Sequence, residues 1–241
     1  MEKRAIIQLD QSIQKVGVKL STSDDLVNSH NLKIYEAAKL FKAMGLNITC
    51  IAGYVNEQNK FFKDILKHPC HEWKHLLKES QSEKEFFSYD WINAVGVGTI
   101  TGVDNLVGID IDGCKDIKVI EYILSLLELP STYDWVVQTG SNNGYHIIIK
   151  MVRPNSLSSK EVVSTYKTNS SFFNVIEKVE ILWNTHLVLP PSKHRSNNYY
   201  KFVNVEFPNQ LPRMVKEETF FQFISKVLKT ETKVVKRRYF E

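Results

Sequence analysis

The chain has 241 residues, of which 43% are hydrophobic and 24% charged, and its formal net charge is +4. This composition suffices for one large domain or two small ones, and no apolar stretch approaches the ~20 residues of a membrane span. So mild a positive charge does not by itself indicate a nucleic-acid partner.

The start of the chain and its cysteines indicate a compartment. Met1-Glu2-Lys3-Arg4 mixes acidic and basic residues and lacks the apolar core of a secretory signal. The three cysteines, Cys50, Cys70 and Cys114, have no zinc-ribbon spacing, and their odd number argues against a disulfide framework. We therefore predict a cytoplasmic protein in a reducing environment, without a membrane partner.

The first third of the chain predicts an N-terminal α/β lobe. Apolar residues recur with helical spacing over residues 32–44, and Gly45 is a suitable C-terminal stop. A strand is expected over residues 46–54, and helices are expected over residues 72–79 and 83–92.

Metal-binding residue types gather between these elements. His68, Cys70, His71 and His75 cluster, and the last two would share one face of a helix at i,i+4 spacing, as in some zinc sites. Surface histidines at a helix start explain the same residues. We favour that second interpretation and do not expect zinc.

The most informative segment is an apolar run that ends in two carboxylates. Leu106-Val107-Gly108-Ile109 leads into Asp110 and Asp112, and Gly113 follows. On a strand, residues two apart point to the same face, with Cα atoms about 6.5 to 7 Å apart. Because two anions so close repel each other, a divalent cation is the usual reason to keep both ionised. The alternative is an exposed Asp-x-Asp-Gly turn.

A hairpin is predicted downstream of the acidic pair. Residues 135–141 and 145–149 are β-type runs, and Asn142-Asn143-Gly144 between them is a strong turn signal. His146 lies in the second run beside three isoleucines. It is either a hydrogen-bonded core histidine or part of a functional site.

A later strand carries one more carboxylate. Glu180 stands in the apolar run 179–182, and the run 187–189 then leads into Pro190-Pro191-Ser192-Lys193-His194. Because an unpaired buried charge is costly, a shared site with a metal and an anionic ligand would supply partners for these groups. The alternative for Glu180 is an edge-strand charge that opposes aggregation.

Three more helices are expected, over residues 116–129, 158–178 and 219–229, the second with a break near residue 168. Basic residues concentrate from Lys226 to Arg238. Such a tail follows nucleic-acid phosphates or is simply a solvated charged helix end.

Taken in order, these motifs resemble the primase-polymerase (Prim-Pol) branch of the archaeo-eukaryotic primases, the bifunctional DNA primase/polymerase N-terminal type. The resemblance spans most of residues 30–205. It rests on Lys67-His68-Pro69 with Trp73, Gly96-Val97-Gly98 with Thr101-Gly102, Gly108 to Gly113, Thr139-Gly140-Ser141 to His146, Val179-Glu180-Ile181, and Pro190 to His194 with Tyr200.

The resemblance implies an α+β fold, with an RRM-like antiparallel or mixed sheet as catalytic core, flanking helices and an N-terminal α/β lobe. We expect a primase-polymerase domain over residues 1–215, whose two lobes meet near residue 95. A C-terminal helix and basic tail would occupy residues 216–241.

The resemblance also implies template-dependent nucleotidyl transfer, as in a DNA primase or DNA polymerase. Asp110, Asp112 and Glu180 would coordinate two divalent ions, Mg²⁺ or Mn²⁺, which carboxylate oxygens suit. His146 would contact the phosphates of an incoming NTP or dNTP. Further nucleotide contacts are expected from Thr139, Ser141, Ser192, Lys193 and His194.

The expected partners are a single-stranded DNA template and a separate helicase, because the sequence has no Walker loop. One departure concerns the family's Ser-x-His motif, which is Gly144-Tyr145-His146 here, so a hydroxyl donor is missing unless Ser141 supplies it across the turn.

Two other functions are compatible with such a fold. A catalytically silent single-stranded DNA-binding module would have no need of all three carboxylates. A rolling-circle nickase needs a His-x-His-type metal pair, whereas Ile147-Ile148 follows His146.

Overall fold

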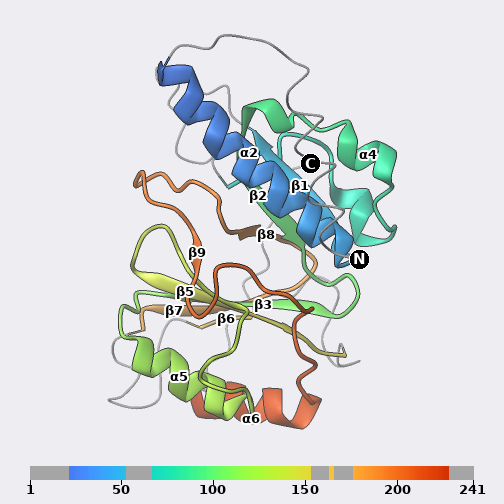
Figure 1. The fold of residues 1–241 in the computed structure, drawn as a ribbon. Coiled ribbons are helices and arrows are strands. Elements are labelled where there is room, and N and C mark those ends of the chain that lie inside the picture. The colour runs from blue at the N-terminus through green and yellow to red at the C-terminus, as the bar shows by residue number, and fades with distance from the viewer. Residues whose placement is uncertain (1–21, 53–66, 153–162, 166–175, 228–241) are drawn as a thin grey trace, which may run out of the picture.

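The computed structural model describes residues 22–52, 67–152, 163–165 and 176–227. Its upper part in Figure 1 is a long helix, α2 (Thr22–Ala43), packed on a three-stranded antiparallel sheet. The strands are β1 (Ile48–Ala52), β2 (Ala94–Ile100) and β8 (His186–Leu189), with β2 in the middle.

The apolar stripe of α2 explains its contact with this sheet. Ile34, Ala38 and Phe41 are fully buried at the i, i+4, i+7 spacing of one helix face. Gly45, with a φ of +91°, then turns the chain toward β1. The helix begins ten residues before residue 32, where we expected it to start. The sequence did not predict this first part, because residues 22–31 are mostly polar and show no apolar periodicity.

Short helical turns replace the two helices expected next. They are η1 (Lys74–Leu77), α4 (Glu83–Phe87) and η2 (Trp91–Asn93). Ser82 caps α4 by accepting a hydrogen bond from the Glu85 amide, and Asp90 caps η2 in the same way. The helix expected over residues 83–92 is therefore shorter: it ends at Phe87, and Asp90 starts a separate turn.

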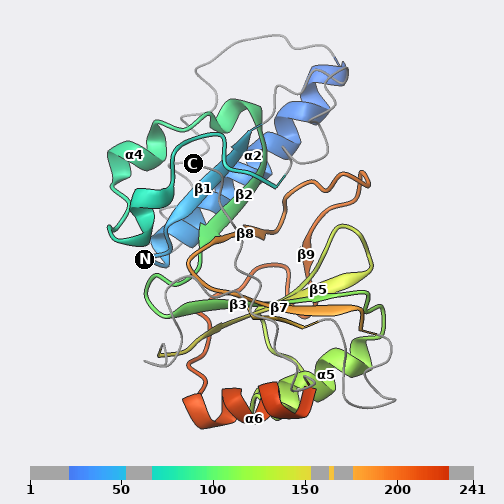
Figure 2. The same cartoon turned by 180° about the vertical axis from the view of Figure 1, so that it is seen from behind.

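The lower part of the molecule in Figure 2 is a second antiparallel sheet. It has six strands in the order β6-β7-β3-β5-β4-β9. Its strands are β3 (Leu106–Asp112), β4 (Val136–Gln138), β5 (Gly144–Lys150), β6 (Val163–Thr165), β7 (Lys178–Leu182) and β9 (Lys201–Phe202). The predicted hairpin is confirmed as β4–β5. The helix expected over residues 158–178 is wrong at residues 163–165, which form strand β6, and at Lys178, where β7 begins; residues 153–162 and 166–175 lie outside the described part.

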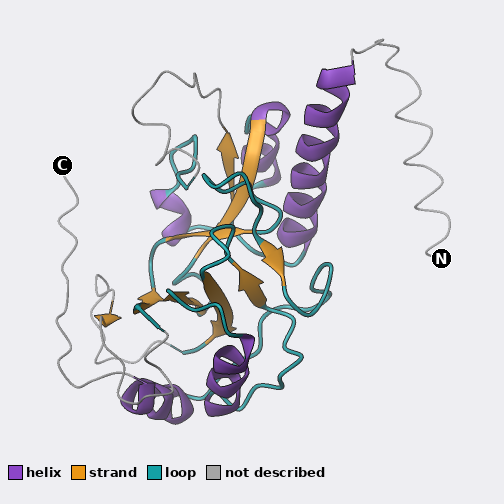
Figure 3. Ribbon diagram, turned by 90° about the vertical axis from the view of Figure 1, so that its left-hand side faces the viewer, coloured by secondary structure: helices purple, strands orange, loops and turns teal. Residues whose placement is uncertain are grey.

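Two helices cover the face of this sheet that points away from α2. They are α5 (Ile117–Leu126) and α6 (Glu217–Val227), which contact each other beneath the sheet in Figures 1 and 2. Asp116 caps α5 by accepting from the Lys118 amide. Figure 3 shows strands gathered between α2 at one end of the molecule and these two helices at the other. The expected α+β class is confirmed.

Three connections in the described part of the chain join the sheets. The chain passes from β2 to β3 through residues 101–105, from β7 to β8 through residues 183–185, and from β8 to β9 through residues 190–200. Thr101 donates its amide to the Thr185 carbonyl at 2.8 Å, and its hydroxyl bonds to the same oxygen at 3.0 Å. Because the first two connections are bonded to each other, they fix one sheet relative to the other. In the part of the chain that the structure describes, no helix combines the length and apolar character needed to cross a membrane.

Candidate metal centre and nucleotide pocket

Strand register places the predicted acidic residues together. On β3, Asp110 lies opposite Glu180 of β7, and Asp112 lies opposite Lys178. Because paired residues of adjacent strands project to the same side and residues two apart share a face, all four side chains lie on one face of the sheet. On the other side of β3, Asp110 is paired with His146 of β5.

The three carboxylates form a compact group. Asp110, Asp112 and Glu180 each offer an oxygen that lies within 4.8 Å of the other two, which is close enough for all three to bind one ion. Glu180 is buried, while the aspartates are partly exposed at the mouth of the group. A set of carboxylate oxygens suits a hard divalent cation such as Mg²⁺ or Mn²⁺. The exposed-turn alternative for Asp110 and Asp112 is therefore wrong, because both belong to β3.

Neighbouring charges balance the burial of this group. Burial pushes the pKa of Asp110 upward, but its neighbours His146 and Lys178 outweigh this effect, so the pKa of Asp110 lies below its usual range. Burial and the charge of Asp110 raise the pKa of Asp112. For Lys178, burial acts to lower the pKa, but Glu180 and both aspartates raise it above the ordinary value. The group thus has an uneven electrostatic field, as expected where a ligand binds.

Two buried atoms of this site have no hydrogen-bond partner within the described ranges: Oδ1 of Asp110 and Nδ1 of His146. Nε2 of His146 lies 3.4 Å from that same Asp110 oxygen. Since buried polar atoms are normally satisfied, orphaned atoms at a carboxylate cluster fit a site that receives a cation and an anionic ligand. His146 is buried as the core alternative required, but its unpartnered nitrogen sets it apart from an ordinary core histidine.

The turn between β4 and β5 borders this centre. The Thr139 hydroxyl bonds the Ser141 hydroxyl at 2.8 Å and donates to the Gly144 carbonyl at 3.1 Å. The Asn143 carbonyl accepts from the Gly113 amide at 2.8 Å, which ties the turn to the end of β3. Ser141 is exposed, so its hydroxyl is the more accessible of the two.

The loop after β8 contains the remaining predicted contacts. The Ser192 hydroxyl is buried and bonds to the amide and carbonyl of Val97 and to the Leu189 carbonyl. Gly96 leaves the room for it, because a β-carbon there would lie 2.6 Å from the Ser192 oxygen. The main chain thus uses the Ser192 hydroxyl fully, and its nucleotide contact stays a prediction.

His194 and Tyr200 extend the site from the same loop. The His194 ring is buried, and its Nδ1 lies 2.9 Å from the Ser196 hydroxyl. The Tyr200 ring packs 5.7 Å from the ring of His146 and 5.8 Å from that of His194. Tyr200 therefore connects His146 on β5 with His194 on the loop after β8.

A cavity of about 420 Å³ opens over the carboxylates. Besides the acidic triad and His146, it is lined by polar or aromatic side chains from both sheets and from the segment after residue 66, namely Lys67, His68, Lys178, Thr185, His186 and Tyr200. Its volume falls in the range of small-molecule sites, roughly 300 to 1,000 Å³. Sequence reasoning missed Lys178 and His186; strand alternation around Glu180 was the available signal for the first of them.

The histidines of the segment 68–75 have other contacts. His71 Nε2 accepts the Cys50 amide at 3.0 Å, and its ring stacks on Tyr89 with centroids 3.5 Å apart. His75 Nε2 lies 2.7 Å from Glu85. These contacts explain both side chains without a metal.

The α+β fold and the acidic triad on its antiparallel sheet agree with the class of protein expected from the motifs, a primase-polymerase. The model of the bifunctional DNA primase/polymerase N-terminal domain, Prim-Pol, matches residues 48–214, so the chain belongs to this family. Membership implies a DNA primase/polymerase type of nucleotidyltransferase activity. No curated protein matches the chain.

Proposed function

We propose that this protein is a template-dependent nucleotidyltransferase that makes or extends short DNA or RNA strands by a two-metal mechanism. The observation that carries this proposal is the convergence of Asp110, Asp112 and Glu180 on one face of the sheet, with ligand oxygens within 4.8 Å of one another.

The triad would hold two Mg²⁺ or Mn²⁺ ions. When bound, such ions lower the cost of deprotonating the attacking 3′ hydroxyl and neutralise the leaving pyrophosphate. The chain's own contribution is to fix the carboxylates on paired strands, where the β3–β7 ladder prevents them from moving apart. The partial burial of the group raises the strength of these charge interactions over that in water.

His146 would hold the β and γ phosphates of the nucleotide. Its free Nδ1 faces no protein partner in the described structure, and its ring is held in place by Asp110 and Tyr200. Thr139 and Ser141 on the turn, and Lys193 and His194 on the loop after β8, would donate further hydrogen bonds to the phosphates. Ser192 would contribute by holding this loop in place, because main-chain groups already use its hydroxyl. Such preorganised donors stabilise charge that develops in the transition state.

The partners in this proposal are a single-stranded DNA template, an NTP or dNTP, and a helicase on another chain. We also propose the domain division at residues 1–215 and 216–241, with lobes that meet near residue 95. The pairing of β8 with β2 means that residues 186–189 belong to the upper sheet.

A strand-synthesis assay tests the proposal. The protein is incubated with single-stranded template, with or without a primer, and with labelled NTPs or dNTPs and Mn²⁺. We expect extension, and we expect Asp110→Asn and Asp112→Asn to reduce it by about 10³-fold or more, the scale of a metal's contribution to catalysis. Asp104→Asn is the matched control, because Asp104 pairs with Lys150 beyond the opposite end of β3.

The same assay separates the alternatives. Template retardation without extension would favour the silent binding module, and a covalent tyrosine–DNA adduct would favour the nickase. Either result would refute the polymerase proposal. Comparing primed with unprimed template then distinguishes strand initiation from elongation.

A further inference from the structure

A lysine occupies the fourth corner of the acidic group. Asp110 faces Glu180 across the β3–β7 ladder, and on the next rung of the same face Asp112 faces Lys178. Three corners of this square are carboxylates and the fourth is an ammonium. Strand alternation makes the arrangement unavoidable, because Lys178 and Glu180 are two residues apart on β7.

The ammonium group lies among the candidate metal ligands. Nζ of Lys178 is 2.7 Å from Oε2 of Glu180 and 3.4 Å from Oδ2 of Asp112. It therefore contacts two of the three carboxylates that would hold a divalent ion. A cation at those oxygens and an ammonium at hydrogen-bond distance from them would repel each other strongly in a partly buried site.

We propose that Lys178 is an exchangeable counter-ion of the metal centre. Its ammonium offsets the mutual repulsion of the three carboxylates before a metal arrives, and it leaves them when a divalent ion binds. Lys178 then sets the metal affinity, because each binding event must displace it. This inference deepens the proposed function and rests on the metal centre described there.

The triphosphate of a bound nucleotide would give the displaced ammonium a second anionic partner. Lys178 lines the same cavity as His146, and this cavity would receive the triphosphate of a nucleotide. A lysine released from Glu180 would bind a phosphate oxygen by a charge-assisted hydrogen bond. Metal and nucleotide are thereby coupled: the metal releases the lysine, and the nucleotide captures it.

An exchangeable counter-ion and a purely structural salt bridge predict changes of opposite sign in the metal affinity when the charge of Lys178 is removed. If Lys178 only braces β7 against β3, removing its charge loosens the carboxylates and weakens metal binding. If it competes with the metal, removing its charge tightens metal binding. The direction of the change therefore separates the two roles without any activity measurement.

The test is a titration of the full chain with Mn²⁺ alone, in which free Mn²⁺ is followed by electron paramagnetic resonance. We expect Lys178→Met to lower the Kd for Mn²⁺ about fivefold, which corresponds to ~1 kcal/mol. Lys178→Gln keeps a hydrogen-bond donor for Glu180 and should show the same direction. Lys150→Met is the matched control, since it removes an ammonium that pairs with Asp104 on the same sheet, and it should change the Kd by less than about twofold.

A second measurement uses a fluorescent dNTP analogue at saturating Mn²⁺, where metal affinity no longer matters. Lys178→Met should bind the analogue about fivefold more weakly, the opposite sign from its effect on the metal. Thermal unfolding with and without Mn²⁺ verifies folding, and the Mn²⁺-induced rise in Tm should be larger in Lys178→Met than in the wild type.

The outcomes are distinguishable. A Kd for Mn²⁺ that stays equal or rises in both Lys178 variants overturns the inference and leaves the proposed function standing. Absence of Mn²⁺ binding by the wild type, or binding that survives Asp110→Asn combined with Asp112→Asn, overturns the metal centre itself and the lysine's role with it.

Discussion

The ring of His186 fills the space that a side chain at Gly98 would need. A β-carbon at Gly98 would overlap Nε2 and Cε1 of His186, and that Nε2 is held by the Thr49 hydroxyl at 2.7 Å. Because His186 lines the candidate nucleotide cavity, the glycine on β2 determines the shape of a wall of the site.

Gly98→Ala should therefore destabilise the protein by about 1 to 3 kcal/mol, the usual cost of overpacking. Urea unfolding gives the value. The double variant Gly98→Ala with His186→Ala should recover part of the loss, because the smaller side chain removes the overlap with the ring. The close approach to the Leu187 carbonyl oxygen, 2.8 Å from the added carbon, remains. Additive losses in this double-mutant cycle would show that the two positions do not interact.

Acid should destabilise the fold through His186. Burial, with the nearby charges of His68 and His71, lowers the pKa of His186 to about 3. In the unfolded chain this histidine takes up a proton near its ordinary pKa of about 6.5, while the folded form stays neutral. This histidine therefore does not reduce the free energy of unfolding above the unfolded-state pKa of about 6.5. The free energy of unfolding falls as the pH drops from there toward 3, by up to ~1.4 kcal/mol per pH unit.

Urea unfolding at a series of pH values measures this slope. His186→Gln should flatten it between pH 6 and about 4, and the rest of the slope would report the other histidines with lowered pKa values, His30, His71 and His194. An unchanged slope in the variant would mean that His186 is protonated in the folded protein.

His146→Gln should impair nucleotidyl transfer while leaving the metal centre in place. The change removes the proposed phosphate contact, so we expect kcat/KM for the nucleotide to fall by about 10²-fold or more, as when one preorganised donor is lost. Mn²⁺ affinity should change little, because the carboxylates remain. Tyr200→Phe is the control, since it preserves the ring that packs against His146. If His146→Gln retained full activity, His146 would be a core residue and not a phosphate contact.

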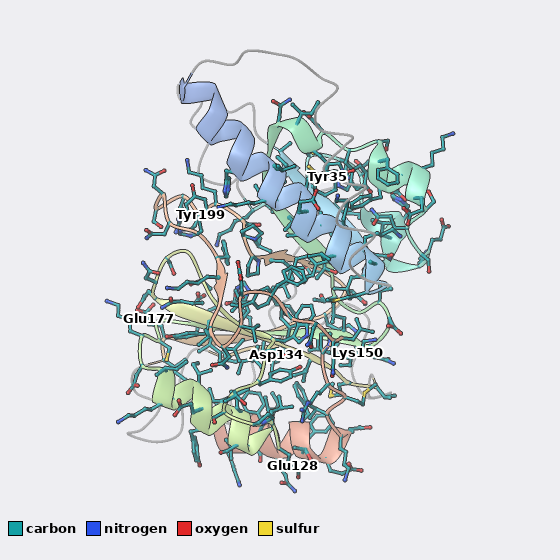
Figure 4. The ribbon with its side chains drawn as sticks, viewed as in Figure 1. Tyr35, Glu128, Asp134, Lys150, Glu177 and Tyr199 are labelled. Carbon is teal, nitrogen blue, oxygen red and sulfur yellow. The ribbon has the colours of Figure 1, made fainter. Side chains whose placement is uncertain are left out.

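An exposed aromatic residue should contact the template. Tyr199 is 45% exposed and packs against His30 with ring centroids 4.7 Å apart. It pairs with Lys193 in an isolated antiparallel bridge outside the strands. Figure 4 shows Tyr199 beside α2, on the loop that leads to β9. Tyr145, Trp183 and Tyr200 are buried instead, the last of them against the cavity over the carboxylates.

Tyr199→Ala should weaken binding of labelled single-stranded DNA about tenfold, the scale of one lost base stack. Fluorescence anisotropy measures it. Phe87→Ala is the matched control, because Phe87 is also an exposed aromatic residue, 57% accessible, and lies at the C-terminal end of α4. Equal effects of the two substitutions would argue against a specific template surface at Tyr199.

The three carboxylates of the site could be predicted from the sequence, whereas the lysine among them could not. Asp110 and Asp112 end an apolar run, and Glu180 interrupts another, so each stands out against its neighbours. Lys178 is the last residue of the segment 158–178, whose spacing predicts a helix, so it is assigned to a different element from Glu180. Only the start of β7 at Lys178 puts both on one strand face.

The upper sheet was the harder part of the fold to predict. The run at residues 187–189 was recognisable as a strand, but its pairing with β2 joins segments that are far apart in the chain. Antiparallel pairing at such separation has no local signal, unlike the β4–β5 hairpin, whose turn residues announce it.

The pairing of β8 with β2 also determines when the upper sheet can be completed as the chain is synthesised. When a ribosome has released only the segment up to Ile100, one edge of β2 has no neighbour from β8, which has yet to be made. Closing so long a loop is entropically costly, so this part of the molecule should mature late and slowly. Until it does, the nascent chain presents an open strand edge that chaperones or aggregation can capture.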